Sequence, residues 1–232
     1  MRRCIALLLI LALVLVCLPS CGKKEPAPEY SLNPDGTLGP FRWGMTWTAA
    51  ARADQRIADE FPEARLGNAE ATGKGSSFRL ILSDAVFLDH RADIELFFQR
   101  FPEEGEGAPM RLSMIRAYMM LEEGEPDYIP LAAARMEAGS PAPVTAEDGS
   151  WVSGKTIRDR VSRDKLREAH PEMGEESLDY LAARPLWTVT VQSLKDPADV
   201  YGSQTAASGH RKFTYTATGY SQVLADILTG RG

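Results

Sequence analysis

The amino-terminal segment decides which part of this chain is left to fold. Arg2 and Arg3 stand before fourteen uncharged and almost wholly apolar residues, Ile5 to Leu18. A positive start followed by an apolar run of this length is typical of a secretory signal peptide, and the run falls short of the roughly 18 residues that span a bilayer. We therefore expect residues 1–20 to be removed, which leaves 212 residues (232 − 20) to fold outside the cytoplasm.

The residues around Cys21 indicate how the exported chain is held. Leu18-Pro19-Ser20-Cys21 resembles the lipobox of bacterial lipoproteins, which has a Leu three residues before a Cys and a small residue directly before it. The resemblance implies cleavage after Ser20, a thioether-linked diacylglycerol on Cys21, and a further acyl group such as palmitate on the new amino end. Two or three acyl chains hold a protein firmly to a membrane. The alternative is a plain secretory leader, with Cys21 left as a free thiol.

The segment after Cys21 bears on localisation and on the domain boundary. Gly22 follows Cys21, whereas an Asp there retains lipoproteins on the inner membrane in many double-membrane bacteria, so the resemblance favours the outer membrane, facing the periplasm. Residues 22–37 contain three Pro and two Gly. This composition predicts a flexible tether over 21–37, which reaches about 50 Å when extended. The folded domain is expected over 38–230.

Charge and cysteine usage narrow the partners of the exported part. Without the leader the formal charge is −8 (24 − 32), which argues against nucleic acid as a partner. The other two cysteines leave with the leader and Cys21 takes the lipid, so no thiol remains for a disulfide or a thiolate metal site. The expected partners are the membrane, through the lipid anchor, and an envelope protein. No cofactor is expected.

Hydrophobic periodicity predicts an α+β fold with an antiparallel sheet of about five strands and several packed helices, in a single domain. Period-two alternation predicts strands at Phe78–Ser83, Arg91–Phe98, Trp187–Val191 and Phe213–Ala217. Residues 110–121 are ambiguous, and we favour a strand in two registers joined by a bulge, with a helix as the alternative. Helical stripes are predicted at residues 47–61, with Thr46 as the N-cap, at 128–138, from Thr156 onward, and at 220–228.

A short motif at the start of the first helix supports this fold class. Gly44-Met45-Thr46 is similar to the Gly-Met-Ser/Thr start of repeating helix-plus-sheet modules in small bacterial envelope lipoproteins, including outer-membrane assembly factors. The match covers about fifteen residues, and Ala49-Ala50 stand where those modules usually have an acidic residue and Val. The resemblance implies an α+β fold.

Residues 149–156 literally match the phosphate-binding loop pattern, in which four residues separate Gly149 from Gly154 and Lys155 and Thr156 follow. In such loops the backbone amides and the Lys bind phosphate at a helix N-terminus. The preceding residues, 141–148, are Pro/Ala-rich and are not the buried strand that such a loop requires, and an exported protein meets little nucleoside triphosphate. We favour a turn with a buried Trp151 and a capping Thr156, and keep nucleotide binding as a remote alternative.

Methionines suggest a second candidate site. Met110, Met114 and Met119 lie within ten residues of one another, and thioethers are soft ligands that select Cu(I). Met also fills irregular cores, and no Cys or His lies near these residues in the sequence. We favour the core interpretation over metal binding.

The three histidines, His90, His170 and His210, lie far apart in predicted loops and form no metal-ligand spacing. A catalytic set with Ser83 or Ser208 could assemble only in space, because the chain has no Gly-x-Ser-x-Gly motif. Two classes of function therefore remain. The favoured one is a noncatalytic binding or assembly module, whose four tryptophans divide between the core and a partner-facing patch. The alternative is an exported hydrolase or metal-handling lipoprotein.

Overall fold

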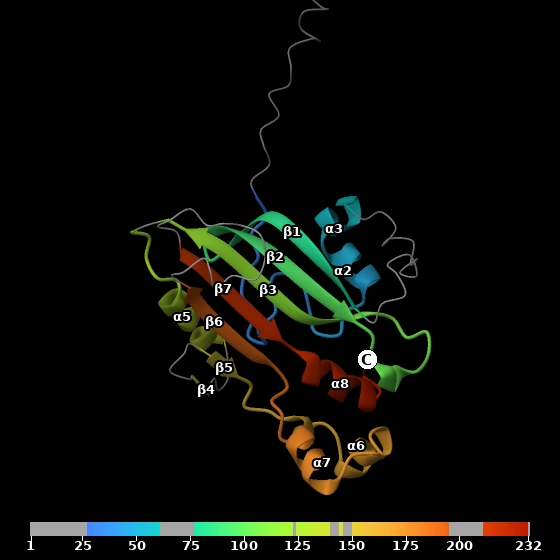
Figure 1. Cartoon of the computed structure of the whole chain (residues 1–232). Helices are drawn as coiled ribbons and strands as arrows, with labels where there is room; N and C mark the ends of the chain where they lie inside the picture. Colours follow the sequence, from blue (N-terminus) through green and yellow to red (C-terminus); the bar gives the residue numbers. More distant parts are fainter. Residues whose placement is uncertain are drawn as a thin grey trace, which may run out of the picture.

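A seven-stranded antiparallel sheet forms the frame of the protein (Figure 1), in the order β1-β2-β3-β7-β6-β5-β4. The computed structural model describes residues 27–60, 77–122, 124–139, 144–145, 150–194 and 211–231. The strands are β1 Ser77–Phe87, β2 His90–Gln99, β3 Arg111–Leu121, β4 Val144–Thr145, β5 Ser150–Val152, β6 Thr188–Leu194 and β7 Arg211–Thr218. The predicted α+β class is confirmed, and β4 and β5 are short strands that the sequence pattern did not predict.

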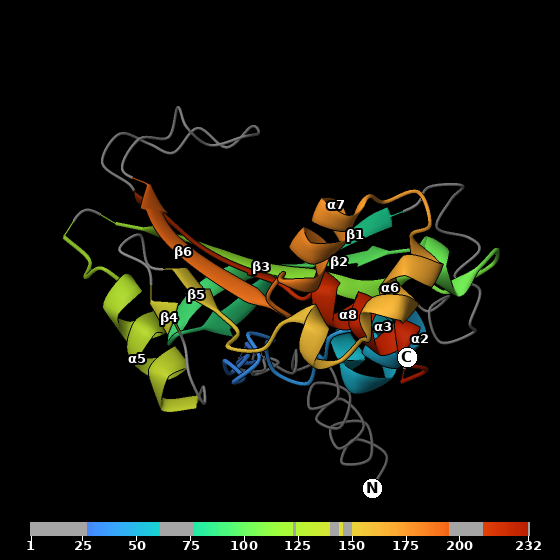
Figure 2. The ribbon, with the colours of Figure 1, turned by 90° about the horizontal axis from the view of Figure 1, so that it is seen from below.

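Helices pack mainly against one face of this sheet. Figure 2 shows α2, α3 and α5 on one side of the sheet, while Figure 1 shows that α6 and α7 project at one end of the molecule and that α8 follows β7. The helical elements are α2 Trp47–Ala53, α3 Gln55–Glu60, η2 Pro102–Glu104, α5 Ile129–Gly139, η3 Ile157–Asp159, α6 Arg163–Ala169, α7 Glu175–Ala182 and α8 Tyr220–Leu228.

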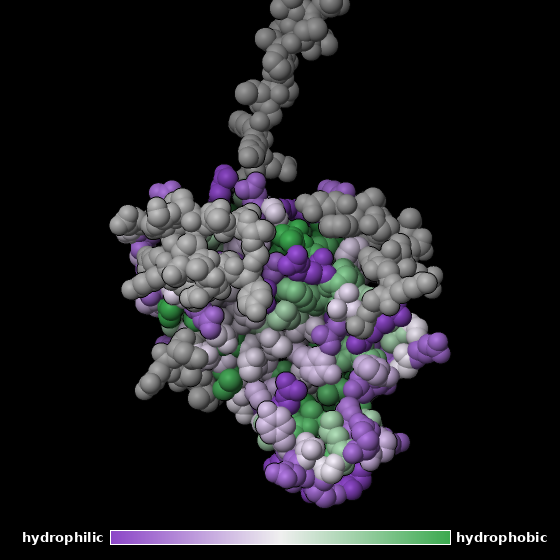
Figure 3. All heavy atoms as spheres, in the orientation of Figure 1, coloured by the Kyte–Doolittle hydropathy of each residue, from purple (hydrophilic) through white to green (hydrophobic). Residues whose placement is uncertain are grey.

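Period-two alternation divides the sheet into a buried face and a partly open one. On β7, Phe213, Tyr215 and Ala217 are fully buried, while Thr214 and Thr216 are half-buried on the other face. This second face looks toward the viewer in Figures 1 and 3, where the described surface over the sheet is a mixture of hydrophilic, weakly polar and hydrophobic residues. Side chains on strands alternate between faces, so β-branched Thr occupies the wetter side.

Glu95 is an exception on this second face. Alternation predicts a solvated side chain, yet only 3% of the residue is exposed. Its carboxylate oxygens lie 3.0 Å from Arg79 and 3.2 Å from Arg116 on the flanking strands. A buried carboxylate of this kind needs opposite charges to offset its desolvation.

Residues 28–37 belong to the folded domain, which corrects the prediction that the tether extends to residue 37. Tyr30 and Thr37 are 2% and 0% exposed. The Tyr30 ring stacks on Phe41 with 5.8 Å between ring centroids, and the Tyr215 hydroxyl donates to the Gly36 carbonyl at 2.7 Å. Pro34 and Gly36, two of the residues that suggested a tether, lie instead in a turn closed by a hydrogen bond from the Gly36 N–H to the Asn33 carbonyl, and turns are the other common role of Pro and Gly.

Asp54 divides the helix that was predicted over residues 47–61. Its backbone is extended (φ −132°, ψ 115°), so α2 ends at Ala53 and α3 begins at Gln55. The Asp54 carboxylate accepts a hydrogen bond from the Arg56 backbone N–H at 2.9 Å and another from the Tyr30 hydroxyl. These bonds favour an extended Asp54 over a continuous helix, because an Asp at this position caps the next helix.

The ambiguous segment at residues 110–121 is a strand, as favoured. Phe97 pairs with Met114 and Phe98 with Leu112, so Ser113 is the extra residue of a bulge. The predicted signal peptide at residues 1–20, Cys21 and residues 22–26 lie outside the described residues. Within the part of the chain that is described, no helix has both the length and the apolar character needed to cross a bilayer.

Candidate functional site

A pocket of about 560 Å³ opens where four separated segments of the chain meet. The segments are residues 34–43, the turn and short helix from 153 to 160, Leu186-Trp187 at the start of β6, and α8. This volume lies within the range of about 300–1,000 Å³ that is typical of ligand sites. We take this pocket as the candidate site because it combines two indole rings with five ionisable side chains.

Trp43 forms one wall of the pocket and is fixed by contacts on two sides. Its indole N–H donates to the Asp35 carbonyl at 2.9 Å. Its ring lies so close to Gly219 that a Cβ atom there would approach the ring carbons to 2.1 Å. Gly219 has an ordinary negative φ of −112°, so close approach, and not backbone strain, requires glycine at this position.

The four tryptophans divide between the core and this wall. Trp151 and Trp47 are buried in the core, at 0% and 3% exposed. Trp43 and Trp187 line the pocket, although Trp187 is itself only 8% exposed. The pocket therefore meets a half-buried Trp43 and a small part of Trp187.

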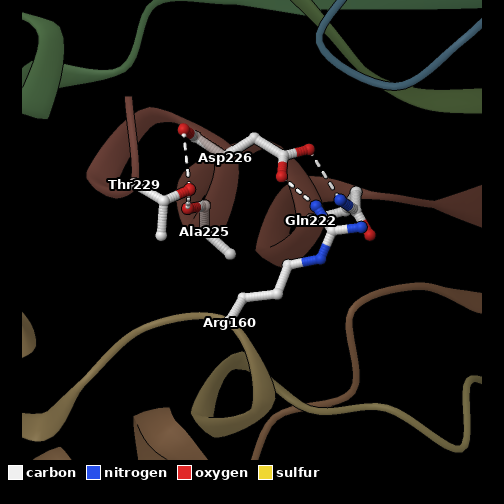
Figure 4. A network of polar contacts seen from close by, with 5 residues as sticks. All are labelled: Arg160, Gln222, Ala225, Asp226 and Thr229. Carbon is white, nitrogen blue, oxygen red and sulfur yellow. Dashed lines mark hydrogen bonds and ion pairs between the residues drawn. The ribbon is translucent and has the colours of Figure 1, made fainter. Parts of the chain in front are cut away.

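Asp226 organises the opposite wall (Figure 4). Its carboxylate pairs with the Arg160 guanidinium and accepts a hydrogen bond at 2.6 Å from the Gln222 side-chain amide, one turn earlier on α8. Thr229 then caps the end of the same helix by donating to the Ala225 carbonyl at 2.8 Å. The wall is therefore a connected network that holds the loop after η3 against α8.

Two of the three cations at the pocket form no ion pair with a carboxylate of the described residues. The Lys155 ammonium has no hydrogen-bond or ion-pair partner among the described residues, while Arg42 donates to the backbone carbonyls of Gly39 and Phe41. The Asp35 carboxylate accepts from the Thr37 backbone at 3.0 Å and from its hydroxyl at 2.6 Å. Both carboxylates of the pocket are therefore bound by neighbouring groups of the protein and not by Arg42 or Lys155.

The structure places part of the phosphate-loop motif at this pocket but not in the geometry of a phosphate loop. Gly154 and Lys155 line the pocket, and Gly149 lies outside the described residues. Thr156 is followed by η3, only three residues long, and its backbone N–H and hydroxyl donate to Asp159 at 2.6 and 3.2 Å. These bonds lower the pKa of Asp159. Trp151 is buried and Thr156 caps η3, as favoured, but Trp151 lies in strand β5 between β4 and β6 and not in a turn.

The methionine candidates do not converge on one site. Met110 and Met119 are each 2% exposed in the core, whereas Met114 is half-buried on the other face of β3. Residues separated by five positions on a strand point to opposite faces, which explains the separation of Met114 from Met119. Across the described segments, no group of three or more His, Cys, Asp or Glu side chains could hold a metal ion.

The histidines that the structure describes lie toward opposite ends of the sheet. His90 begins β2 and lies 3.3 Å from Glu125, while His170 ends α6 and lies 3.7 Å from Glu103, which follows the far end of β2. The ten residues of β2 correspond to about 30 Å. Ser83 is exposed at the bulge of β1, and Ser208 and His210 lie outside the described residues.

Sequence reasoning missed most of the pocket. Arg160, Gln222 and Asp226 carried no motif, and Asp35 fell in the predicted tether. The i, i+4 spacing of Gln222 and Asp226 is a local signal for a helix-face pair, but not for a pocket.

No known protein family matches this chain, and neither a curated protein nor a solved structure is significantly similar to it.

Proposed function

We propose that this chain is a lipid-anchored lipoprotein of the cell envelope, facing the periplasm, whose domain is a noncatalytic binding module. The observation that carries the binding role is the pocket beside Trp43, which four rigidly packed segments form together. The lipobox-like Leu18-Pro19-Ser20-Cys21 supports the anchor, and Gly22 favours the outer membrane over the inner one.

The hydrogen bonding inside the pocket favours binding over catalysis. General acid–base chemistry needs a side chain that is free to exchange a proton with a reacting group. Among the described residues, both pocket carboxylates already have partners. Asp226 is bound by Arg160 and Gln222, and Asp35 is bound by Thr37. A ligand would therefore meet cations, aromatic rings and an amide, a set of groups suited to binding and orienting it.

One observation favours the second candidate, an exported hydrolase. The side chains of Glu103 and His170 are only 10% and 15% exposed and lie 3.7 Å apart, and Glu103 lines a hollow of about 390 Å³. Within the described residues, Glu103 Oε2 and His170 Nε2 are buried with no hydrogen-bond partner. A buried carboxylate next to an imidazole is a combination that some active sites use. The test is hydrolysis of an ester substrate by the wild-type protein and by His170→Ala. If the substitution abolishes hydrolysis and leaves the melting temperature unchanged, this candidate is favoured over the first.

The anchor is tested by Cys21→Ser in a bacterial host. We expect the wild-type protein to fractionate with membranes and to have an intact mass that includes the lipid and lacks residues 1–20. The variant should accumulate as an unlipidated precursor with its leader attached. Normal processing and anchoring of Cys21→Ser would contradict the proposal.

The binding role is tested by site-specific photocrosslinking in intact cells. A photoreactive phenylalanine analogue at Gln222, in the pocket, should crosslink to an envelope component. The same analogue at Ser177, an exposed residue of α7 outside the pocket, serves as the matched control and should not form that crosslink. Equal crosslinking from both positions, or none from Gln222, would argue against the pocket as a binding site.

A further inference from the structure

The pocket beside Trp43 is locally positive in a protein that is acidic overall. Three cations, Arg42, Lys155 and Arg160, line it together with two anions, Asp35 and Asp226, which leaves a net charge of +1 (3 − 2). The whole chain has a formal charge of −6. A cavity whose charge opposes that of the surrounding surface draws ligands of the opposite sign, because low-dielectric walls focus the field.

Two of the three positively charged side chains of the pocket form no ion pair within the described residues. Arg160 is paired with Asp226, so its charge is largely offset. Arg42 is exposed and contacts only backbone carbonyls in the described structure, and the exposed Lys155 ammonium forms no hydrogen bond or ion pair there, although it interacts electrostatically with the nearby Asp159 carboxylate. A ligand anion that reached these two cations would gain charge-assisted hydrogen bonds without displacing a carboxylate of the protein.

The aromatic part of the pocket selects for shape. Because the Trp43 N–H is already bonded to Asp35, the indole presents only its apolar ring surface to a ligand. Gly219 and the Asp35 bond fix this ring before any ligand arrives, so little conformational entropy is lost on stacking. A flat ring or the apolar face of a sugar packs well on such a surface.

We infer that the pocket binds a small anionic ligand, whose carboxylate meets Lys155 and Arg42 and whose ring packs an apolar face on Trp43. An acidic sugar of the cell wall and an aromatic carboxylate share this chemistry. The inference rests on the proposed binding role of the pocket, and it is independent of the anchor at Cys21.

Paired probes test the inference on the full chain purified in detergent. N-acetylmuramic acid is compared with N-acetylglucosamine, which has the same ring without the carboxylate, and indole-3-acetate is compared with indole-3-acetamide. Calorimetry and tryptophan fluorescence should show one of the carboxylates binding at least about tenfold more tightly than its neutral partner. Added salt should weaken this binding. The pair that responds identifies the source of the ligand.

Variants test the assignment to Lys155. Lys155→Gln should weaken binding of the carboxylate about tenfold and leave binding of the neutral probe unchanged. Arg158→Gln removes an exposed cation of the same segment that does not line the pocket, and should change binding less than about twofold. Equal affinity for charged and neutral probes, or no effect of Lys155→Gln, would overturn the inference and leave the binding role intact. Failure of all four probes to bind would also overturn it, and the Gln222 crosslink then decides whether the binding role fails too.

Discussion

Gly219 sets the position of Trp43, and therefore one wall of the pocket, through the absence of a side chain. The indole ring packs directly on the Gly219 backbone, and any Cβ atom there would overlap it. Tyr215 acts in a comparable way on the neighbouring loop, because its buried hydroxyl donates to the Gly36 carbonyl. Both contacts hold residues 34–43 against the sheet and α8.

Gly219→Ala should displace Trp43 and disturb the pocket. We expect a shift in tryptophan fluorescence and a loss of about 1–3 kcal/mol in the free energy of unfolding, because the overlap forces neighbouring groups to move. Gly174→Ala is the matched control, since Gly174 is also the N-cap of a helix and a Cβ atom there meets nothing within 4 Å. A Gly219→Ala protein that resembles this control in both measurements would show that Trp43 is not held as described.

Tyr215→Phe should destabilise the domain by about 1–3 kcal/mol at neutral pH, because the buried Gly36 carbonyl loses its donor. Burial raises the pKa of Tyr215 well above its usual value of 10.0. Because Tyr215 ionises less readily in the folded state than in the unfolded state, its contribution to the free energy of unfolding is complete below pH 10. This contribution is lost as the pH rises above 10. Urea unfolding between pH 7 and pH 11 should therefore show a smaller alkaline loss for the variant than for the wild type. Equal alkaline losses would contradict this assignment.

Local capping signals and tertiary contacts together set the ends of the helices. Thr46 was predicted to cap the first helix, and its hydroxyl accepts from the Ala49 backbone N–H at 3.2 Å. Ser162 caps α6 in the same way through Lys165. Asp54 was not predicted to end a helix, because the apolar stripe continues through it from Ala51 to Ile57. The hydrogen bond between Asp54 and Tyr30 joins residues that are distant in sequence, so the hydrophobic periodicity could not predict it.

Thr46→Ala should lower the free energy of unfolding by about 1 kcal/mol, because the Ala49 N–H loses its acceptor at the start of α2. Thr48→Ala, inside the first turn of the same helix, is the control and should be neutral or slightly stabilising, since Ala is the better helix former. Chemical denaturation of both variants measures the difference. Equal effects would show that Thr46 does not act as a cap.

At the scale of the whole molecule, residues 27–37 decide where the domain begins. These residues contact two strands of the sheet. The Tyr30 backbone N–H donates to the Val86 carbonyl of β1 at 2.8 Å, and the Tyr215 hydroxyl of β7 donates to the Gly36 carbonyl. The pocket depends on this placement, because Asp35 lies in the same segment and binds Trp43. The binding site and the amino-terminal boundary of the fold are therefore one structural unit.

Truncation tests this boundary. A protein that lacks residues 1–26 should keep the stability of the domain. One that lacks residues 1–37 should lose at least about 3–5 kcal/mol, because it loses the buried Tyr30 and the acceptor of the Tyr215 hydroxyl. Thermal and urea unfolding compare the two. Equal stability of both truncations would restore the tether boundary at residue 37.

The sequence by itself determined the local structure of this protein. Alternation of apolar residues with Thr identified β6 and β7, and Thr46 and Thr156 were recognised as caps, because strands and helix ends depend on neighbours a few residues away. Only the tertiary structure decided the strand order, the folded role of residues 27–37 and the pocket beside Trp43. The Tyr215–Gly36 bond joins residues 179 positions apart, and contacts at such separations leave no period or spacing in the chain.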